Sequence, residues 1–270
     1  MQTHLVIIDP QNDFCNPNGS LFVPGADQDI DRLSSMVDRL VTKLDDIHIT
    51  MDSHKRVDIS HPIWFVDAQG NHPPPFTLIS SADLISGRWR TYLPGLHART
   101  LAYLQALEAR GRYGHTIWPE HCIIGDEGQN IAPKLSASIH QWEDRFAAPE
   151  IITKGSNPYT EHFSAVQAEV PDPEDPSTQV NTSFISTLEQ ADIILLAGQA
   201  LSHCVANTVM DIADNFSDPK YIKKLVLLTD ATSEVPNPPN MTIFSDFTAK
   251  FLADMQAKGM KLSTTTDVLT

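Results

Sequence analysis

The sequence is poor in cysteine. Only three cysteines occur, Cys15, Cys122 and Cys204, and they are widely spaced. The odd number and the lack of a C-x-x-C pair argue against a zinc knuckle or a redox dithiol. We therefore expect free thiols in a reducing compartment.

Basic residues and long apolar runs are also scarce. The chain has 19 Lys and Arg against 34 Asp and Glu, a formal net charge of −15. Binding to nucleic acid or to an anionic membrane needs a basic face, so we expect neither as a partner. No run approaches membrane-spanning length, and the opening MQTHLVIID lacks the basic and long apolar regions of a signal peptide. These absences predict a cytoplasmic protein.

The apolar residues of the chain occur in short runs instead of long ones. With 270 residues and 41% hydrophobic content it is long enough for one sizeable core. Runs without polar alternation are typical of a parallel sheet that is covered on both faces. The predicted strands are 5–9, 48–50, 150–153, 192–198, 224–230 and, more weakly, 260–264.

Helical patterns lie between these runs. Apolar residues recur at three- and four-residue spacing in 27–44, 98–110, 203–214 and 241–258. Asp27 or Asp29 could cap the start of the first. The alternation predicts a single α/β domain over residues 1–270: three layers, doubly wound, with a mostly parallel six-stranded sheet and helices on both faces.

Cys204 stands out within the segment GQALSHCVANTV. With Ser202 as N-cap, the thiol would lie in the first helical turn, where free N–H groups and the helix dipole stabilise a thiolate. A lone cysteine is most simply a small buried side chain. Its position after a glycine turn at the end of a predicted strand favours a nucleophile instead.

Asp9 and Lys154 also lie at the ends of predicted strands. Ligands of doubly wound sheets bind outside the carboxyl ends of the strands. Asp9 could serve Cys204 as general base, and the charge of Lys154 would lower the pKa of the thiol. The alternatives are an Asx turn into Pro10 and a solvated lysine.

A candidate metal site begins with Asp52 and His54. They are two residues apart in an extended stretch, so their side chains point the same way. His121, in IWPEHC, is the predicted third ligand. One carboxylate and two imidazoles leave coordination positions open, which suits a catalytic or substrate-binding ion: zinc foremost, with iron or manganese as alternatives. The rival ligands are His61, His115 and His162.

Taken together, these motifs have a familiar order. DPQNDF with PNGSLFVPGA, then DSH, WPEHC, ITKG, GQALSHCV and LLTDAT follow one another from residue 4 to about residue 235. In them the chain resembles the isochorismatase-like cysteine hydrolases, and within these it is most similar to the nicotinamidase/pyrazinamidase group. A long insert at about 55–114 interrupts the resemblance.

The resemblance implies an amidohydrolase that cleaves nicotinamide, or a close aromatic amide, as part of NAD salvage. Cys204 would form a thioester and expel ammonia, Asp9 would shuttle the proton, and Lys154 would keep the thiol ionised. The N–H groups of Ala200 and Cys204 would form the oxyanion hole, with a cis peptide expected at Gln199–Ala200.

The resemblance also implies the rest of the substrate site. The ion on Asp52, His54 and His121 would bind the pyridine nitrogen, directly or through water. The side chains expected to pack around the ring are Phe14, Trp118 and Phe163. The family's habit implies a homo-oligomer, although the insert could block an interface or create one.

Two differences from the family's pattern leave other functions as alternatives. The chain has A-L-S-H-C where the family often has A-T-x-Y-C, and the insert could be a lid, an oligomer contact or a changed pocket wall. One alternative is a carbamoyl or ureido hydrolase of the same superfamily. The others are a hydrolase in which metal-bound water attacks and Cys204 is a bystander, and a binding protein without turnover.

Overall fold

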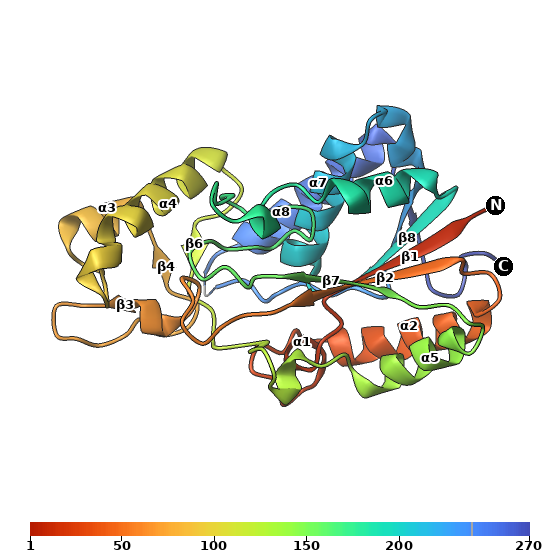
Figure 1. Cartoon of the computed structure of the whole chain (residues 1–270), viewed down its shortest axis with the longest axis horizontal. Helices are drawn as coiled ribbons and strands as arrows, with labels where there is room; N and C mark the ends of the chain where they lie inside the picture. Colours follow the sequence, from red (N-terminus) through yellow and green to blue (C-terminus); the bar gives the residue numbers. More distant parts are fainter. Residues whose placement is uncertain (239) are drawn as a thin grey trace.

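Six parallel strands form the centre of the molecule. The structure is a computed structural model that describes residues 1–238 and 240–270. Its main sheet has the order β10-β9-β8-β1-β2-β7, and every pair of neighbours is parallel (Figure 1). The strands are β1 (Thr3–Ile8), β2 (Asp46–Asp52), β7 (Glu150–Lys154), β8 (Ile193–Gly198), β9 (Leu225–Leu228) and β10 (Lys261–Ser263). All six predicted strands are confirmed.

Helices cover both faces of this sheet, as predicted. Figure 1 shows α2 (Ala26–Leu40) and α5 (Pro133–Glu143) on one face, and α6 (Thr182–Gln190), α7 (Ala206–Asn215) and α8 (Ile243–Lys258) on the other. The predicted helices at 27–44, 203–214 and 241–258 correspond to α2, α7 and α8. The sequence reading did not find α5 and α6.

The capping of α2 differs from the prediction. Its N-cap is Gly25, whose φ of 97° is left-handed, and no side chain caps the helix. Asp27 and Asp29 are already inside the helix, so neither can act as the cap. Asp29 is instead buried and accepts hydrogen bonds from Gln199 Nε2 at 2.9 Å and from Ser233 Oγ at 2.6 Å.

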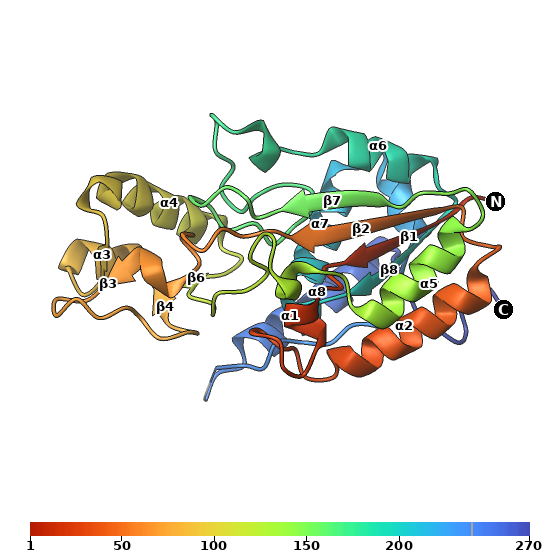
Figure 2. The ribbon, with the colours of Figure 1, turned by 60° about the horizontal axis from the view of Figure 1, so that its bottom comes forward.

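The segment 55–114 has a small apolar cluster of its own. It lies beyond the carboxyl ends of β2 and β7, which Figure 2 shows from a second side. Its elements are β3 (Phe65–Val66), β4 (Leu78–Ile79), α3 (Ser81–Ser86), β5 (Arg90–Thr91) and α4 (His97–Arg110), and β6 (His115–Thr116) follows it. The predicted helix at 98–110 is α4. Buried members of the cluster include Trp64, Phe65, Leu104 and Leu107.

None of the helices in the part of the chain that the structure describes is long and apolar enough to cross a membrane.

His115 ties the insert to the chain that follows it. Its Nε2 lies 2.9 Å from the carbonyl oxygen of Ile59, and its ring packs against Phe65 and Tyr103. Burial lowers the pKa of His115 to about 4. The folded protein therefore holds this ring neutral at pH values where the unfolded chain, with a histidine pKa of about 6.5, binds a proton.

Stability should therefore depend on pH through His115. The unfolded state binds the extra proton, so the free energy of unfolding should fall as pH drops from about 6.5 to about 4, by up to about 1.4 kcal/mol per pH unit. His115→Gln should remove this part of the slope in urea denaturation measured across that range. His97→Gln, at an exposed position, is the control. Equal slopes for wild type and His115→Gln would contradict the prediction.

Candidate active site

A buried lysine joins the two other predicted catalytic side chains, Asp9 and Cys204, to the predicted metal ligand Asp52. Lys154 Nζ lies 2.9 Å from Asp9 Oδ2, 3.2 Å from Asp52 Oδ1 and 3.6 Å from Cys204 Sγ. Asp9 follows β1, Asp52 and Lys154 end β2 and β7, and Cys204 lies in the turn after β8. Parallel strands thus bring four distant residues together at one edge of the sheet.

A close backbone approach holds the first and last of these segments. Gly198 ends β8 with φ 114°, and a Cβ there would lie 2.0 Å from the carbonyl oxygen of Ile8. Only glycine fits this position, because any side chain would push β8 away from the strand that carries Asp9. The next peptide, Gln199–Ala200, is cis, as the resemblance implies.

The helix that carries Cys204 begins differently from the prediction. Residues Leu201–Val205 form a π-helical turn that runs into α7, and its N-cap is Ala200, without a side-chain hydrogen bond. Ser202 lies inside that turn and so cannot cap it. Ser202 Oγ instead lies 2.9 Å from His203 Nδ1 and accepts a hydrogen bond from Val235 N at 3.1 Å.

Burial dominates the electrostatics of the Cys204 thiol and the Asp9 carboxylate. It raises the pKa of Cys204 well above the usual thiol range, and Lys154 acts in the opposite direction. Burial also raises the pKa of Asp9, again opposed by Lys154. Lys154 itself stays charged: burial would lower its pKa, but Asp52 and Asp9 raise it well above the usual value. The thiol and the carboxylate thus lie beside a cation, while burial favours the neutral form of each.

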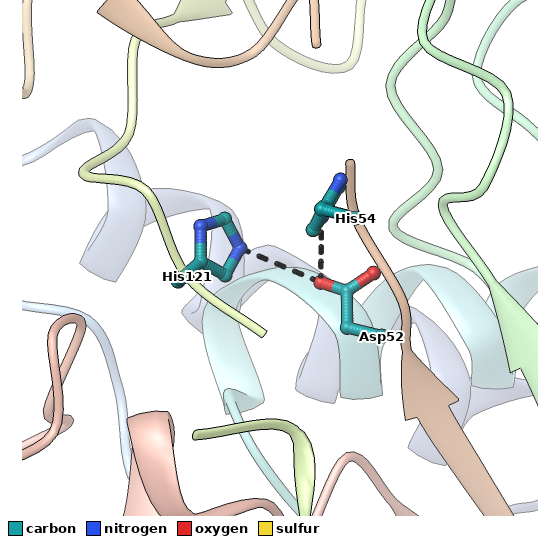
Figure 3. A group of neighbouring side chains, drawn as sticks. All are labelled: Asp52, His54 and His121. Atoms are coloured by element: carbon teal, nitrogen blue, oxygen red, sulfur yellow. Dashed lines mark ion pairs between the residues drawn. The ribbon is translucent and has the colours of Figure 1, made fainter. Parts of the chain in front are cut away.

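The three predicted metal ligands point toward one another (Figure 3). Asp52 Oδ2 lies 3.2 Å from His54 Nε2 and 3.5 Å from His121 Nε2, and all three side chains are buried. The other ring nitrogen of each histidine is engaged elsewhere: Nδ1 of His54 with Asp58 Oδ2 at 3.1 Å, and Nδ1 of His121 with the carbonyl oxygen of Pro119 at 2.8 Å. One carboxylate and two oriented imidazoles suit a divalent metal ion.

Of the three rival histidines, one lies beside the predicted metal ligands and two are not part of that group. The ring centroid of His61 lies 5.2 Å from that of His54 and 5.4 Å from that of His121, so His61 borders the cluster. His115 packs against the insert instead, through Ile59 and Phe65. His162 accepts a hydrogen bond at Nδ1 from Gly155 N at 3.3 Å, outside the group of three ligands.

A pocket opens between Cys204 and this cluster. The three predicted ring-packing residues line it, together with two polar residues that the sequence reading missed. One is His203, next to Cys204; the sequence marks His203 as a departure from the family's motif but does not assign it to the pocket. The other is Glu161, whose carboxylate accepts hydrogen bonds from Trp118 Nε1 at 3.2 Å and His162 N at 3.1 Å, and whose pKa burial raises to about 7. The pocket lining includes Phe14, Trp118, Phe163, Ala200, Asp52 and His121.

Comparison with known proteins finds that the chain is similar to nicotinamidases. No family model matches it. It is 26% identical over 209 residues to a nicotinamidase of Escherichia coli K12, covering 77% of this chain and 74% of that protein.

Solved structures share the fold. The yeast nicotinamidase bound to the inhibitor nicotinaldehyde superposes with a TM-score of 0.65 at 18% identity, over 97% of this chain and 100% of that one. A Pyrococcus horikoshii pyrazinamidase in complex with zinc gives 0.57 at 19% identity, over 98% and 99%. The chain thus has the fold of the isochorismatase-like hydrolases, and its resemblance to their nicotinamidase/pyrazinamidase group is confirmed.

Proposed function

We propose that the protein is an amidohydrolase that cleaves the carboxamide C–N bond of nicotinamide, or of a close aromatic amide, to the acid and ammonia. One observation carries the proposal. A buried lysine lies within 3.6 Å of both a thiol and a carboxylate, beside a pocket walled by aromatic rings. The nicotinamidase relatives support the choice of substrate.

In this proposal Cys204 is the nucleophile and Asp9 is the proton carrier. Cys204 Sγ attacks the carboxamide carbon while its proton passes to Asp9, and the carbonyl electrons move onto the oxygen. When they return, the C–N bond breaks and Asp9 gives its proton to the nitrogen, which leaves as ammonia. Asp9 then takes a proton from water, whose oxygen attacks the thioester carbon. The C–S bond breaks, the acid is released, and Asp9 returns the proton to Cys204 Sγ. Lys154 stabilises the thiolate throughout.

We assign the oxyanion hole to the N–H groups of Ala200 and Cys204. Both residues line the pocket. Among the described residues, no backbone carbonyl accepts a hydrogen bond from the Ala200 N–H, which leaves this donor available. Fixed backbone donors of this kind stabilise the negative charge that develops on the substrate oxygen.

We assign the metal site to Asp52, His54 and His121, with zinc as the ion. An ion held there would bind the pyridine nitrogen, directly or through water, and so would orient the ring. This assignment is supported by the pocket between these ligands and Cys204: a small substrate with its ring nitrogen at the ligands would have its carboxamide toward the thiol. Phe14, Trp118 and Phe163 would pack against the ring.

Replacing the nucleophile tests the reaction. Cys204→Ala should lower ammonia release from nicotinamide by at least about 10³-fold, because no other group can form the thioester. Cys15→Ala, at a buried cysteine outside the pocket, is the control and should retain activity. Substantial activity in Cys204→Ala would indicate attack by metal-bound water. A wild type that releases ammonia only from carbamoyl compounds would indicate the other branch of the superfamily.

Replacing Asp58 tests the metal site. Asp58 Oδ2 orients His54, and Asp58 Oδ1 is itself held by Ser60 N at 2.9 Å. Asp58→Asn should weaken zinc binding about 10- to 100-fold in chelator competition, because the histidine loses the carboxylate that fixes its ring. Asp126→Asn, at an exposed position, should leave the affinity unchanged. Equal affinities for Asp58→Asn and wild type would argue against this site.

A further inference from the structure

The end of the insert touches the helix that carries Cys204. Arg112 follows α4, and its guanidinium donates to Asp211 Oδ1 at 2.6 Å and to Asn207 Oδ1 at 3.2 Å, both in α7. The next residue, Tyr113, donates a hydrogen bond from its hydroxyl to the carbonyl oxygen of Ser202. A segment outside the family's motifs thus contacts the residues around the nucleophile.

Asn207 links Arg112 to His203, the residue before Cys204. Its side chain is fully buried, and Nδ2 donates to the carbonyl oxygen of His203 at 2.8 Å. A guanidinium has donors and no acceptor, so the amide oxygen of Asn207 has to face Arg112. The amide nitrogen then has to face His203. Arg112 therefore selects the orientation in which Asn207 can hold that carbonyl.

Holding the His203 carbonyl also fixes the N–H of Cys204. The two groups belong to one peptide unit, which is planar, and in a trans peptide they point in opposite directions. Tyr113 adds a second restraint, because its ring stacks on the His203 ring with centroids 4.9 Å apart and planes 16° apart. The peptide that joins His203 to Cys204 is thus restrained from two sides.

We propose that Arg112 and Asn207 are positioning residues for the oxyanion hole: they aim the Cys204 N–H at the substrate oxygen. The inference rests on the function proposed above and extends it, since it gives the end of the insert a role in the reaction. A purely structural role, in which Arg112 only anchors the insert to Asp211, predicts a different set of measurements.

The test compares Asn207→Leu with a matched control in the same helix. Asn215→Leu removes the same kind of bond, from an asparagine Nδ2 to the carbonyl oxygen four residues earlier, here Asp211 at 2.8 Å. That carbonyl is not joined to Cys204. Misdirecting one oxyanion donor should lower kcat for nicotinamide by about 10- to 100-fold in Asn207→Leu, with KM within about threefold. Asn215→Leu should keep the wild-type kcat.

Inhibition by nicotinaldehyde supplies a second readout. Its carbonyl carbon bonds to Cys204 Sγ, the carbonyl electrons move onto oxygen, and the thiol proton goes to that oxygen or to Asp9. The adduct places a tetrahedral oxygen in the oxyanion hole, as the transition state does. The inhibition constant should therefore rise in Asn207→Leu by the same factor as kcat falls. Zinc content should not change, because the metal ligands lie on other segments.

Arg112→Lys keeps the charge opposite Asp211 but loses the planar fork that also reaches Asn207. This variant should show a smaller loss of kcat than Asn207→Leu, with a parallel rise in the inhibition constant of nicotinaldehyde. If Asn207→Leu does not fold, the result for Arg112→Lys tests the inference.

Three results would overturn the inference: wild-type kcat in the folded variants, a loss of kcat with an unchanged aldehyde constant, or an equal loss in Asn215→Leu. A wild-type protein that releases no ammonia from nicotinamide would instead refute the proposed function, and the inference with it.

Discussion

The ammonium group of Lys154 is the charge around which this end of the molecule is arranged. A lysine with 1% of its side chain exposed is stable only if the lost hydration is replaced, and here Asp9 and Asp52 replace it at 2.9 and 3.2 Å. Each carboxylate in turn depends on the lysine, since neither is exposed. The three residues come from β7, β2 and the residue after β1, so the pairing of these strands and the charge balance support each other.

Asp52 links the two halves of the candidate site through this arrangement. One of its oxygens faces Lys154 and the other faces His54 and His121. Its backbone is fixed as well, because Gln11 donates to the Asp52 carbonyl oxygen at 2.7 Å and accepts from the Asp52 N–H at 2.7 Å. One carboxylate thus joins the lysine beside the thiol to the two predicted histidine ligands.

Much of this could be predicted from the sequence, and the failures have physical causes. Strands buried on both faces are continuous apolar runs, so all six strands could be found. The motif residues Asp9, Asp52 and Lys154 follow such runs, and strand ends meet at one edge. Helices α5 and α6 are short and largely polar on one face, although Pro133 at the first turn of α5 and the Asn181 cap of α6 are usable signals.

Caps and long-range partners could not be predicted in the same way. Ser202 and Asp29 are residue types that favour N-caps, but a π turn and a left-handed Gly25 place the helix starts elsewhere. Glu161 and Asp58 belong to no motif and acquire their roles only when distant segments fold together. The contact of Arg112 with Asn207 joins residues that are 95 positions apart, and no local sequence pattern predicts it.

The position of the site at the meeting of β1, β2, β7 and the turn after β8 has a consequence for how the protein matures. Asp9 and Cys204 are separated by most of the chain although β1 and β8 are neighbours in the sheet, so the thiol cannot approach this carboxylate until β8 has been synthesised and has paired with β1. Contacts so distant in sequence form late and slowly. The thiol therefore stays apart from the carboxylate in a nascent chain, and the return of activity after denaturation would report the pairing of β8, β1, β2 and β7, at whose ends the four residues lie.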